Sequence, residues 1–195
     1  ASDSIENAAP NGGDGNLDGV PDAQQAHVAS LPHPDNEIYV TLVAAETAPL
    51  KDVAFADVAS GDAPEGMDLV FDLLSFTLTG VEPGGAATLE LLVHDSLVLN
   101  AFCACGPTAK YPYEHWYPFL FDGACGAEIA ADGEIAIDLV DGGRGDSDLA
   151  ADGQIVVLAG AAINNHPRPW QNAHGRFDVY MNYLVGPQDM ITRVN

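Results

Sequence analysis

Hydrophobic and polar residues alternate along most of this chain, with the two-residue period of β-strands that have one buried face. The alternating runs are short, and Gly, Pro and Asp separate them. The three-to-four-residue spacing of amphipathic helices is nearly absent. Strands are expected at Glu37–Ala44, Asp52–Val58, Leu69–Thr79, Thr88–His94, Glu134–Val140, Gln154–Leu158 and Arg176–Val185. This pattern predicts an all-β fold, an antiparallel β-sandwich.

Two segments add detail to this fold. The Gly- and Pro-rich run from Gly80 to Gly85 separates two alternating runs, so a hairpin is expected between Leu69–Thr79 and Thr88–His94. Near the N-terminus, Pro21 suits the first turn of a helix. One short N-terminal helix is therefore expected, from Asp22 to about Ala29.

A length of 195 residues suits one domain with small extensions. Residues 1–13 are polar and without periodicity, and we expect them to form an N-terminal arm. Residues 14–160 are expected to form the sandwich domain. Residues 161–195 are expected to form a C-terminal extension with one strand.

The strand of the C-terminal extension has an apolar face, formed by Phe177, Val179, Met181, Tyr183 and Val185. Such a strand can complete its own sheet, or it can pair with the sheet edge of a neighbouring subunit. The second arrangement is head-to-tail and generates open filaments. Strand exchange therefore predicts a homo-oligomer or homopolymer.

The segment from Asp14 to Asp22 has the spacing of a calcium-binding loop. The expected ligands are Asp14, Asn16, Asp18, the backbone carbonyl of Val20, and Asp22. Gly19 allows the sharp turn at position six, while Gln25 replaces the Glu of an EF-hand at position twelve. The loop is therefore closer to the Asp-rich repeats of thrombospondin type 3 and dockerin modules, which it resembles. The alternative is a solvated Asp/Gly turn.

A second acidic, Gly-rich loop follows the strand that ends at Val140. Its carboxylates are Asp141, Asp146, Asp148 and Asp152. These carboxylates are candidates for one further Ca2+ site, because the glycines allow backbone carbonyls to turn inward. The alternative is a strand connection stabilised by Asx turns.

The charge balance limits the partners. Acidic residues outnumber basic residues by 29 to 6, and the formal net charge is −23. Such a surface repels nucleic acids and anionic membranes, so neither is expected as a partner. No run of eighteen apolar residues exists, so membrane insertion is not expected. The chain begins at Ala1 without Met, which is typical of a secreted protein after removal of its signal peptide.

The three cysteines allow two interpretations. In an oxidising compartment, Cys103 or Cys105 is expected to form a disulfide with Cys125. Alternatively, the three thiols bind Cu(I) or zinc together with His94 or His115.

Two further ligand-binding alternatives rest on aromatic residues. The segment Tyr111–Phe119 is rich in aromatic rings beside predicted calcium loops, a layout found in lectins, so glycan binding is one alternative. Burial of these rings over the sandwich edge is the other. His166 and His174 flank Trp170, as in secreted copper-binding proteins.

Four segments together resemble the choice-of-anchor U domain of bacterial secreted surface proteins. They are Asp14–Gln25 with Val28-Ala29, Leu74-Ser-Phe-Thr-Leu-Thr-Gly80, Trp116-Tyr-Pro-Phe119 and Leu139–Gly153. The resemblance covers roughly residues 14–160. It implies an extracellular β-rich domain without an established chemistry.

Motifs of catalysis are missing from the sequence. It contains no Gly-x-Ser-x-Gly, no His-Glu-x-x-His and no phosphate-binding loop, so the protein is not expected to be an enzyme. The predicted function is that of a secreted, calcium-stabilised extracellular structural protein that self-assembles into a filament or surface layer. The alternative is an extracellular ligand-binding module for a glycan or copper.

Overall fold

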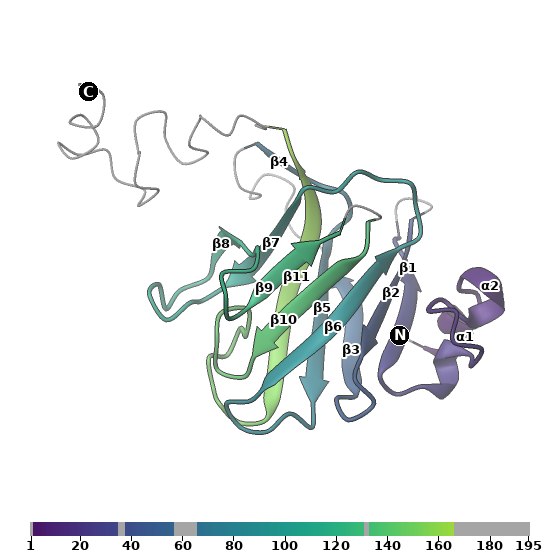
Figure 1. Ribbon diagram of the computed structural model, residues 1–195, viewed down its shortest axis with the longest axis horizontal. Helices are drawn as coiled ribbons and strands as arrows, with labels where there is room; N and C mark the ends of the chain where they lie inside the picture. The colour runs from purple at the N-terminus through teal and green to yellow at the C-terminus, as the bar shows by residue number, and fades with distance from the viewer. Residues whose placement is uncertain (1, 35–37, 57–65, 131–132, 166–195) are drawn as a thin grey trace.

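A computed structural model describes residues 2–34, 38–56, 66–130 and 133–165, in which two antiparallel sheets pack face to face (Figure 1). The first sheet consists, in spatial order, of β1 (Val28–Pro32), β2 (Tyr39–Ala44), β6 (Ala86–Val93), β10 (Ile135–Val140) and β9 (Gly126–Ile129). The second consists of β3 (Leu50–Ala56), β5 (Leu73–Thr79), β11 (Gln154–Asn164), β7 (Ala101–Gly106) and β8 (His115–Pro118), with β4 (Met67–Leu69) pairing with β11. The predicted all-β sandwich is confirmed.

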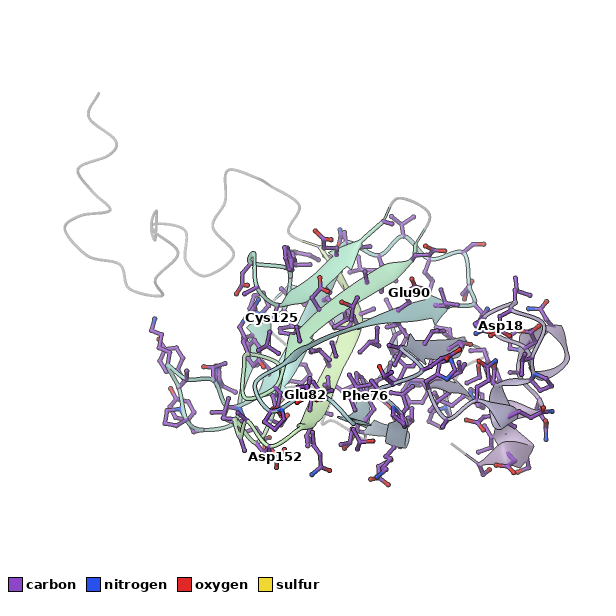
Figure 2. All side chains as sticks on the ribbon, turned by 60° about the horizontal axis from the view of Figure 1, so that its bottom comes forward. Asp18, Phe76, Glu82, Glu90, Cys125 and Asp152 are labelled. Carbon is purple, nitrogen blue, oxygen red and sulfur yellow. The ribbon has the colours of Figure 1, made fainter. Side chains whose placement is uncertain are left out.

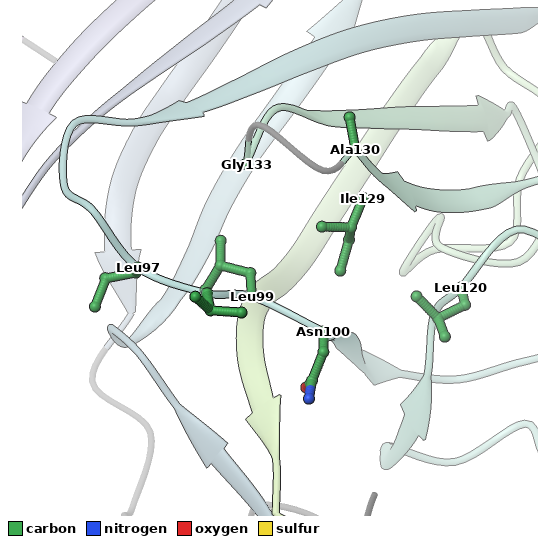
Figure 3. Close-up of a pocket in the computed structure, with 8 residues that line it drawn as sticks. Leu97, Leu99, Asn100, Leu120, Ile129, Ala130 and Gly133 are labelled. Carbon is green, nitrogen blue, oxygen red and sulfur yellow. The ribbon is translucent and has the colours of Figure 1, made fainter. Parts of the chain in front are cut away.

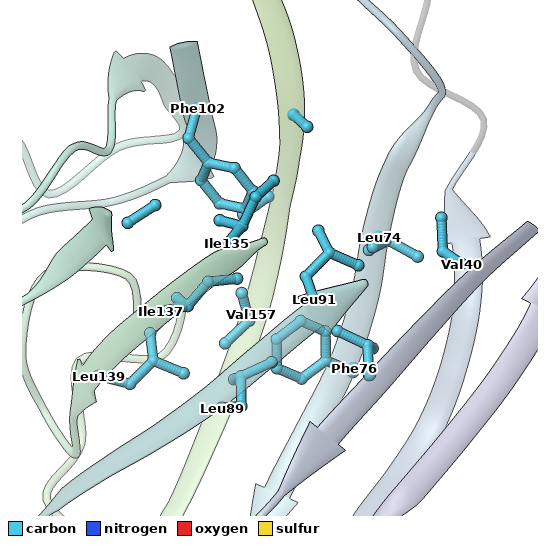
Figure 4. Close-up of a cluster of buried hydrophobic side chains, with 14 of the residues drawn as sticks. Val40, Leu74, Phe76, Leu89, Leu91, Phe102, Ile135, Ile137, Leu139 and Val157 are labelled. Carbon is cyan, nitrogen blue, oxygen red and sulfur yellow. The ribbon is translucent and has the colours of Figure 1, made fainter. Parts of the chain in front are cut away.

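The core lies between the two sheets and follows the alternation in the sequence (Figure 4). On β10, Ile135, Ile137 and Leu139 are at most 1% exposed, whereas the residues between them are half-buried. Phe76 on β5 and Leu91 on β6 contribute to the core from opposite sheets. Burial of each such side chain contributes about 1.5–3 kcal/mol to stability.

Strand β7 is buried on both faces, because a second apolar cluster covers the outside of its sheet. The cluster consists of Ala101, Cys103, Ala162, Met67, Leu69 and Trp116. Two-sided burial removes the polar half of the alternation, so the sequence of β7 gives no strand signal.

The predicted hairpin around Gly80–Gly85 is wrong. β5 pairs with β3 and β11, whereas β6 pairs with β2 and β10. The Gly- and Pro-rich run therefore crosses from one sheet to the other. Alternation specifies which face of a strand is buried but not which strand lies beside it.

The predicted helix from Asp22 to about Ala29 is also wrong in its extent. Only Asp22–Gln24 forms a helical turn, the 3-10 helix η1, and Val28 already begins β1. Val28 pairs with Val43 on β2, so sheet pairing overrides the local pattern.

The N-terminal arm contains two short helices, α1 (Asp3–Glu6) and α2 (Pro10–Gly13). Helix α1 packs against β1 and η1. Glu6 is buried there, and burial raises the pKa of its carboxyl group. The predicted N-terminal arm thus covers one edge of the first sheet.

At the other end, β11 continues to Asn164, four residues beyond the predicted domain boundary. Residues 161–164 therefore belong to the sandwich. The strand predicted at Arg176–Val185 lies outside the described residues. Strands β1, β7, β8 and β9 were not expected from the pattern, because they are short or buried on both faces.

Replacement of Gly126 tests the packing at the β9 edge. Gly126 has φ 128°, and a Cβ there would lie 2.4 Å from the carbonyl oxygen of Leu120. Gly126→Ala should lower the free energy of unfolding by about 2–6 kcal/mol, because backbone strain and overpacking add. Chemical denaturation measures this loss.

The matched control is Gly84→Ala. Gly84 also has a positive φ of 75°, but no atom lies within 4 Å of its added Cβ. The free energy of unfolding of Gly84→Ala should therefore fall by only about 1–3 kcal/mol, from backbone strain alone. Equal losses in the two variants would contradict the contact between β9 and Leu120.

Candidate metal centre

The loop from Asp14 to Val20 curls so that its side-chain oxygens face its own backbone amides. Asp14 accepts hydrogen bonds from the amides of Asp18 and Gly19, at 3.1 and 3.0 Å. Asp18 accepts one from the amide of Val20 at 2.8 Å and one from the side chain of Asn16 at 3.0 Å. Three predicted ligand side chains therefore lie in one small region.

Gln25, at position twelve of the loop, reaches the same region. Its Nε2 donates to Oδ1 of Asp18 at 3.1 Å and to the carbonyl oxygen of Val20 at 3.0 Å. Rotation of this amide by 180° would present Oε1 to the same place. The sequence pattern treated position twelve as lacking a ligand, so Gln25 is a residue that sequence reasoning missed.

The donor set fits calcium, which prefers carboxylate, amide and carbonyl oxygens. The hydrogen bond from the Val20 amide lowers the pKa of Asp18, which favours its charged form. No group of three or more His, Cys, Asp or Glu side chains with metal-binding geometry occurs in residues 2–34, 38–56, 66–130 and 133–165. The turn from Asn16 to Val20 is contacted by two carboxylates, those of Asp14 and Asp18, so amide and carbonyl oxygens would complete the site.

Asp22 is the predicted ligand that the structure places differently. It is completely buried, and its two oxygens accept the amide of Gly15 at 3.1 and 3.0 Å. The hydroxyl of Ser30 on β1 donates to it at 2.5 Å. Asp22 therefore joins the start of the loop to the first sheet.

A hydrogen-bonded chain continues from Asp22 across the sheet. Ser30 contacts Thr41 of β2 at 2.6 Å, and Thr41 contacts Nε2 of His94 at 2.8 Å. Ser30 and Thr41 are completely buried. Burial lowers the pKa of His94, which favours its neutral form.

Gly15 closes this network from the loop side. A Cβ at Gly15 would lie 2.3 Å from Oγ1 of Thr41 and 2.6 Å from Oγ of Ser30. Only a glycine allows the loop backbone to approach so closely. Tyr39 on β2 donates to the carbonyl of Ile5 at 2.6 Å and holds α1 beside the network.

The second acidic loop binds its own backbone. Oδ2 of Asp141 accepts hydrogen bonds from the amides of Gly84 and Gly153, at 2.8 and 2.9 Å. Asp146 accepts hydrogen bonds from the amides of Gly142 and Val156, at 2.8 and 3.0 Å. Both carboxyl groups are buried, and burial raises the pKa of Asp146.

The remaining two carboxylates of this loop form short local turns. Asp148 accepts the amide of Ala150 at 2.7 Å, and Asp152 accepts that of Gln154 at 3.0 Å. The structure does not bring the four carboxylates of this loop together as a metal-binding group. Figure 2 shows Asp152 far from Asp18, so the two acidic loops are separate.

The disulfide predicted between Cys125 and Cys103 or Cys105 is not present. All three cysteines are buried and lie within the described residues, where the structure contains no disulfide. Cys103 contacts the sulfur of Met67 at 3.6 Å, and burial raises the pKa of its thiol to about 12.

The aromatic segment is partly a core element. Tyr117 and Phe119 face the core and are 8% and 0% exposed. Tyr111, Tyr113 and His115 form a ring cluster with centroids 5.3–5.9 Å apart. The predicted copper residues His166, Trp170 and His174 lie outside the described residues.

Comparison with known proteins identifies no homologue of this chain. No protein-family model matches the chain, and searches of curated proteins and of solved structures return no significant match. The resemblance to the choice-of-anchor U domain therefore stays a prediction. Among the described residues, no helix has both the length and the apolar character that crossing a membrane requires.

Asp22→Asn tests the buried junction. The amide cannot replace both carboxylate oxygens, so one contact with Gly15 or Ser30 is lost. In the presence of a chelator, the free energy of unfolding should fall by about 1.5–3 kcal/mol, which is the typical contribution of a hydrogen bond to a charged group. The control Asp152→Asn changes an exposed turn and should stay within about 0.5 kcal/mol of the unmodified protein. An Asp22→Asn loss as small as that of the control would contradict the junction.

Proposed function

We propose that this protein is a secreted, calcium-stabilised structural protein that serves as a subunit of a self-assembling filament or surface layer. The observation that supports the proposal is the loop Asp14–Gln25. The side chains of Asn16 and Gln25 reach the carboxylate of Asp18, Asp14 accepts hydrogen bonds from the amides of the same turn, and Asp22 couples the loop to the sandwich.

Calcium would be held by Asp14, Asn16, Asp18, the carbonyl of Val20 and the side chain of Gln25. The ion would supply positive charge where two carboxylates lie close together, in a chain with a net charge of −23. The residues of the chain do the structural work. Gly15 and Asp22 transmit the fixed loop conformation to β1, and α1 packs on the same strand.

An extracellular location fits the chemistry of this loop. Its ligand set holds two carboxylates, fewer than the tight intracellular calcium sites, and extracellular modules bind calcium at 10⁻⁴–10⁻³ M. The proposed role is non-catalytic: calcium fixes the direction in which the N-terminal residues meet the sandwich.

Calcium titration followed by thermal unfolding tests this function. Calcium at a hundredfold excess over Kd should stabilise the protein by about 2.7 kcal/mol and raise Tm by about 5–10 °C. Gln25→Glu should tighten calcium binding at least about tenfold, because it adds a charged ligand at position twelve. Gln25→Ala should weaken binding.

The matched control is Gln24→Glu, which adds the same charge at the neighbouring exposed position. It should leave the calcium affinity nearly unchanged, since Gln24 lies outside the ligand set. A Tm that does not respond to calcium would contradict the proposal. Equal effects of the two Glu variants would show that general charge, and not position twelve, governs binding.

A further inference from the structure

An apolar groove lies at the end of the sandwich where β6 connects to β7 (Figure 3). Its volume is about 470 Å³. Its lining includes Val98, Leu99, Asn100, Leu120 and Ile129. Val98 is 83% exposed and Leu120 is 45% exposed, so the groove presents large apolar side chains to solvent.

The groove borders the edge of the first sheet that β9 forms. At the other edges, α1 and η1 pack on β1, and β3 has an irregular register between Lys51 and Ala54. Such features protect edge strands from pairing. The remaining edges are β8 and β9.

On β9, the outward side is paired only in part. Ala127 donates to the carbonyl of Phe119 and accepts from the amide of Phe121. The chain then turns at Asp122. Alternate residues of a strand direct their backbone groups to the same side, so those of Ile129 point outward beside the groove. Among the described residues, no strand pairs with this side of Ile129.

The described part of the chain ends beside this groove. Asn100, on the groove wall, donates to the carbonyl of Asn164 at 3.3 Å and accepts its amide at 2.6 Å. Asn164 is the last residue of β11. Eleven residues, 166–176, then separate the described part from the apolar face of 177–185. Fully extended, eleven residues span at most about 36–40 Å.

Charge also favours this segment as the occupant. Residues 166–195 contain three arginines and two aspartates, whereas residues 1–165 contain three basic and 27 acidic residues. Asp95, Glu128 and Glu134 flank the groove residues in sequence, and Arg176 directly precedes the apolar segment. The segment thus combines apolar side chains for the groove with a positive charge for its acidic surroundings.

We propose that this groove is the acceptor site for residues Phe177–Val185 of a second copy of the chain. The inference rests on the proposed function and specifies how its subunits join. Each copy inserts its apolar segment into the groove of one neighbour. Its own groove receives the apolar segment of the other neighbour, so the copies assemble head-to-tail. Apolar residues of the donor fill the groove, and its backbone extends the ladder at Ile129.

A complementation experiment with the full-length chain tests the proposal. The groove variant is Val98→Asp with Leu120→Asp, and the donor variant is Val179→Asp with Met181→Asp. Light scattering after size-exclusion chromatography measures the mass of each. The unmodified protein should form multimers, and each variant alone should have the mass of one chain. An equimolar mixture should form a dimer, because it contains one intact groove and one intact donor.

Control variants add Asp residues outside the groove and outside the apolar face of the donor. Ile5→Asp changes an apolar residue of similar exposure (41%) at the N-terminal helix, far from the groove. Tyr180→Asp with Asn182→Asp alters the other face of the donor segment. Both controls should assemble like the unmodified protein.

Three results would overturn the proposal: an unmodified protein that stays monomeric at its highest soluble concentration, variants that still assemble, or a mixture that stays monomeric. The last result, with multimers of the unmodified protein, would indicate another interface. A cooperative thermal unfolding transition of each variant, measured without calcium, shows that it is folded. If calcium still raises Tm but the mixture does not form a dimer, strand exchange is contradicted and the calcium-stabilised fold is not. If calcium does not raise Tm, the proposed stabilisation by calcium is contradicted.

Discussion

The buried carboxylate of Asp22 is the contact on which the N-terminal part of the structure depends. It accepts the amide of Gly15 and the hydroxyl of Ser30, and so connects the acidic loop to the first sheet. A buried carboxylate is costly unless hydrogen bonds compensate for its lost hydration. The close approach of Gly15 and the chain through Thr41 to His94 provide this compensation. The loop therefore cannot move independently of the sandwich.

Much of the fold could be predicted from the sequence, because alternation directly reflects burial. β5, β6 and β10 were found near their observed positions. Strand neighbours could not be predicted: β5 and β6, joined by a turn-like run, lie in different sheets, because pairing depends on contacts distant in sequence. β7 has no alternation to detect, because both its faces are buried.

The candidate site was predicted only in part, for a similar reason. Spacing within one loop is local information, so it identified the Asp14, Asn16 and Asp18 group that the structure brings together. The role of Asp22 depends on Ser30, which lies on β1, a strand that the pattern did not predict. Gln25 was set aside because of its residue type, although its position brings it to Asp18. In the second loop, Asp141 and Asp146 bind backbone amides, a use of carboxylates that composition cannot distinguish from metal binding.

Hydrogen exchange of the Gly15 amide, with and without calcium, tests the central claim most directly. This amide lies between the candidate ligands and Asp22, so it reports the coupling of the loop to the sheet. If calcium binds here, exchange at Gly15 should slow by up to about a hundredfold at a hundredfold excess over Kd, provided that only the closed loop binds the ion. The amide of Gly84, which donates to Asp141 in the other acidic loop, is the internal reference. Unchanged exchange at Gly15 in saturating calcium would contradict the account.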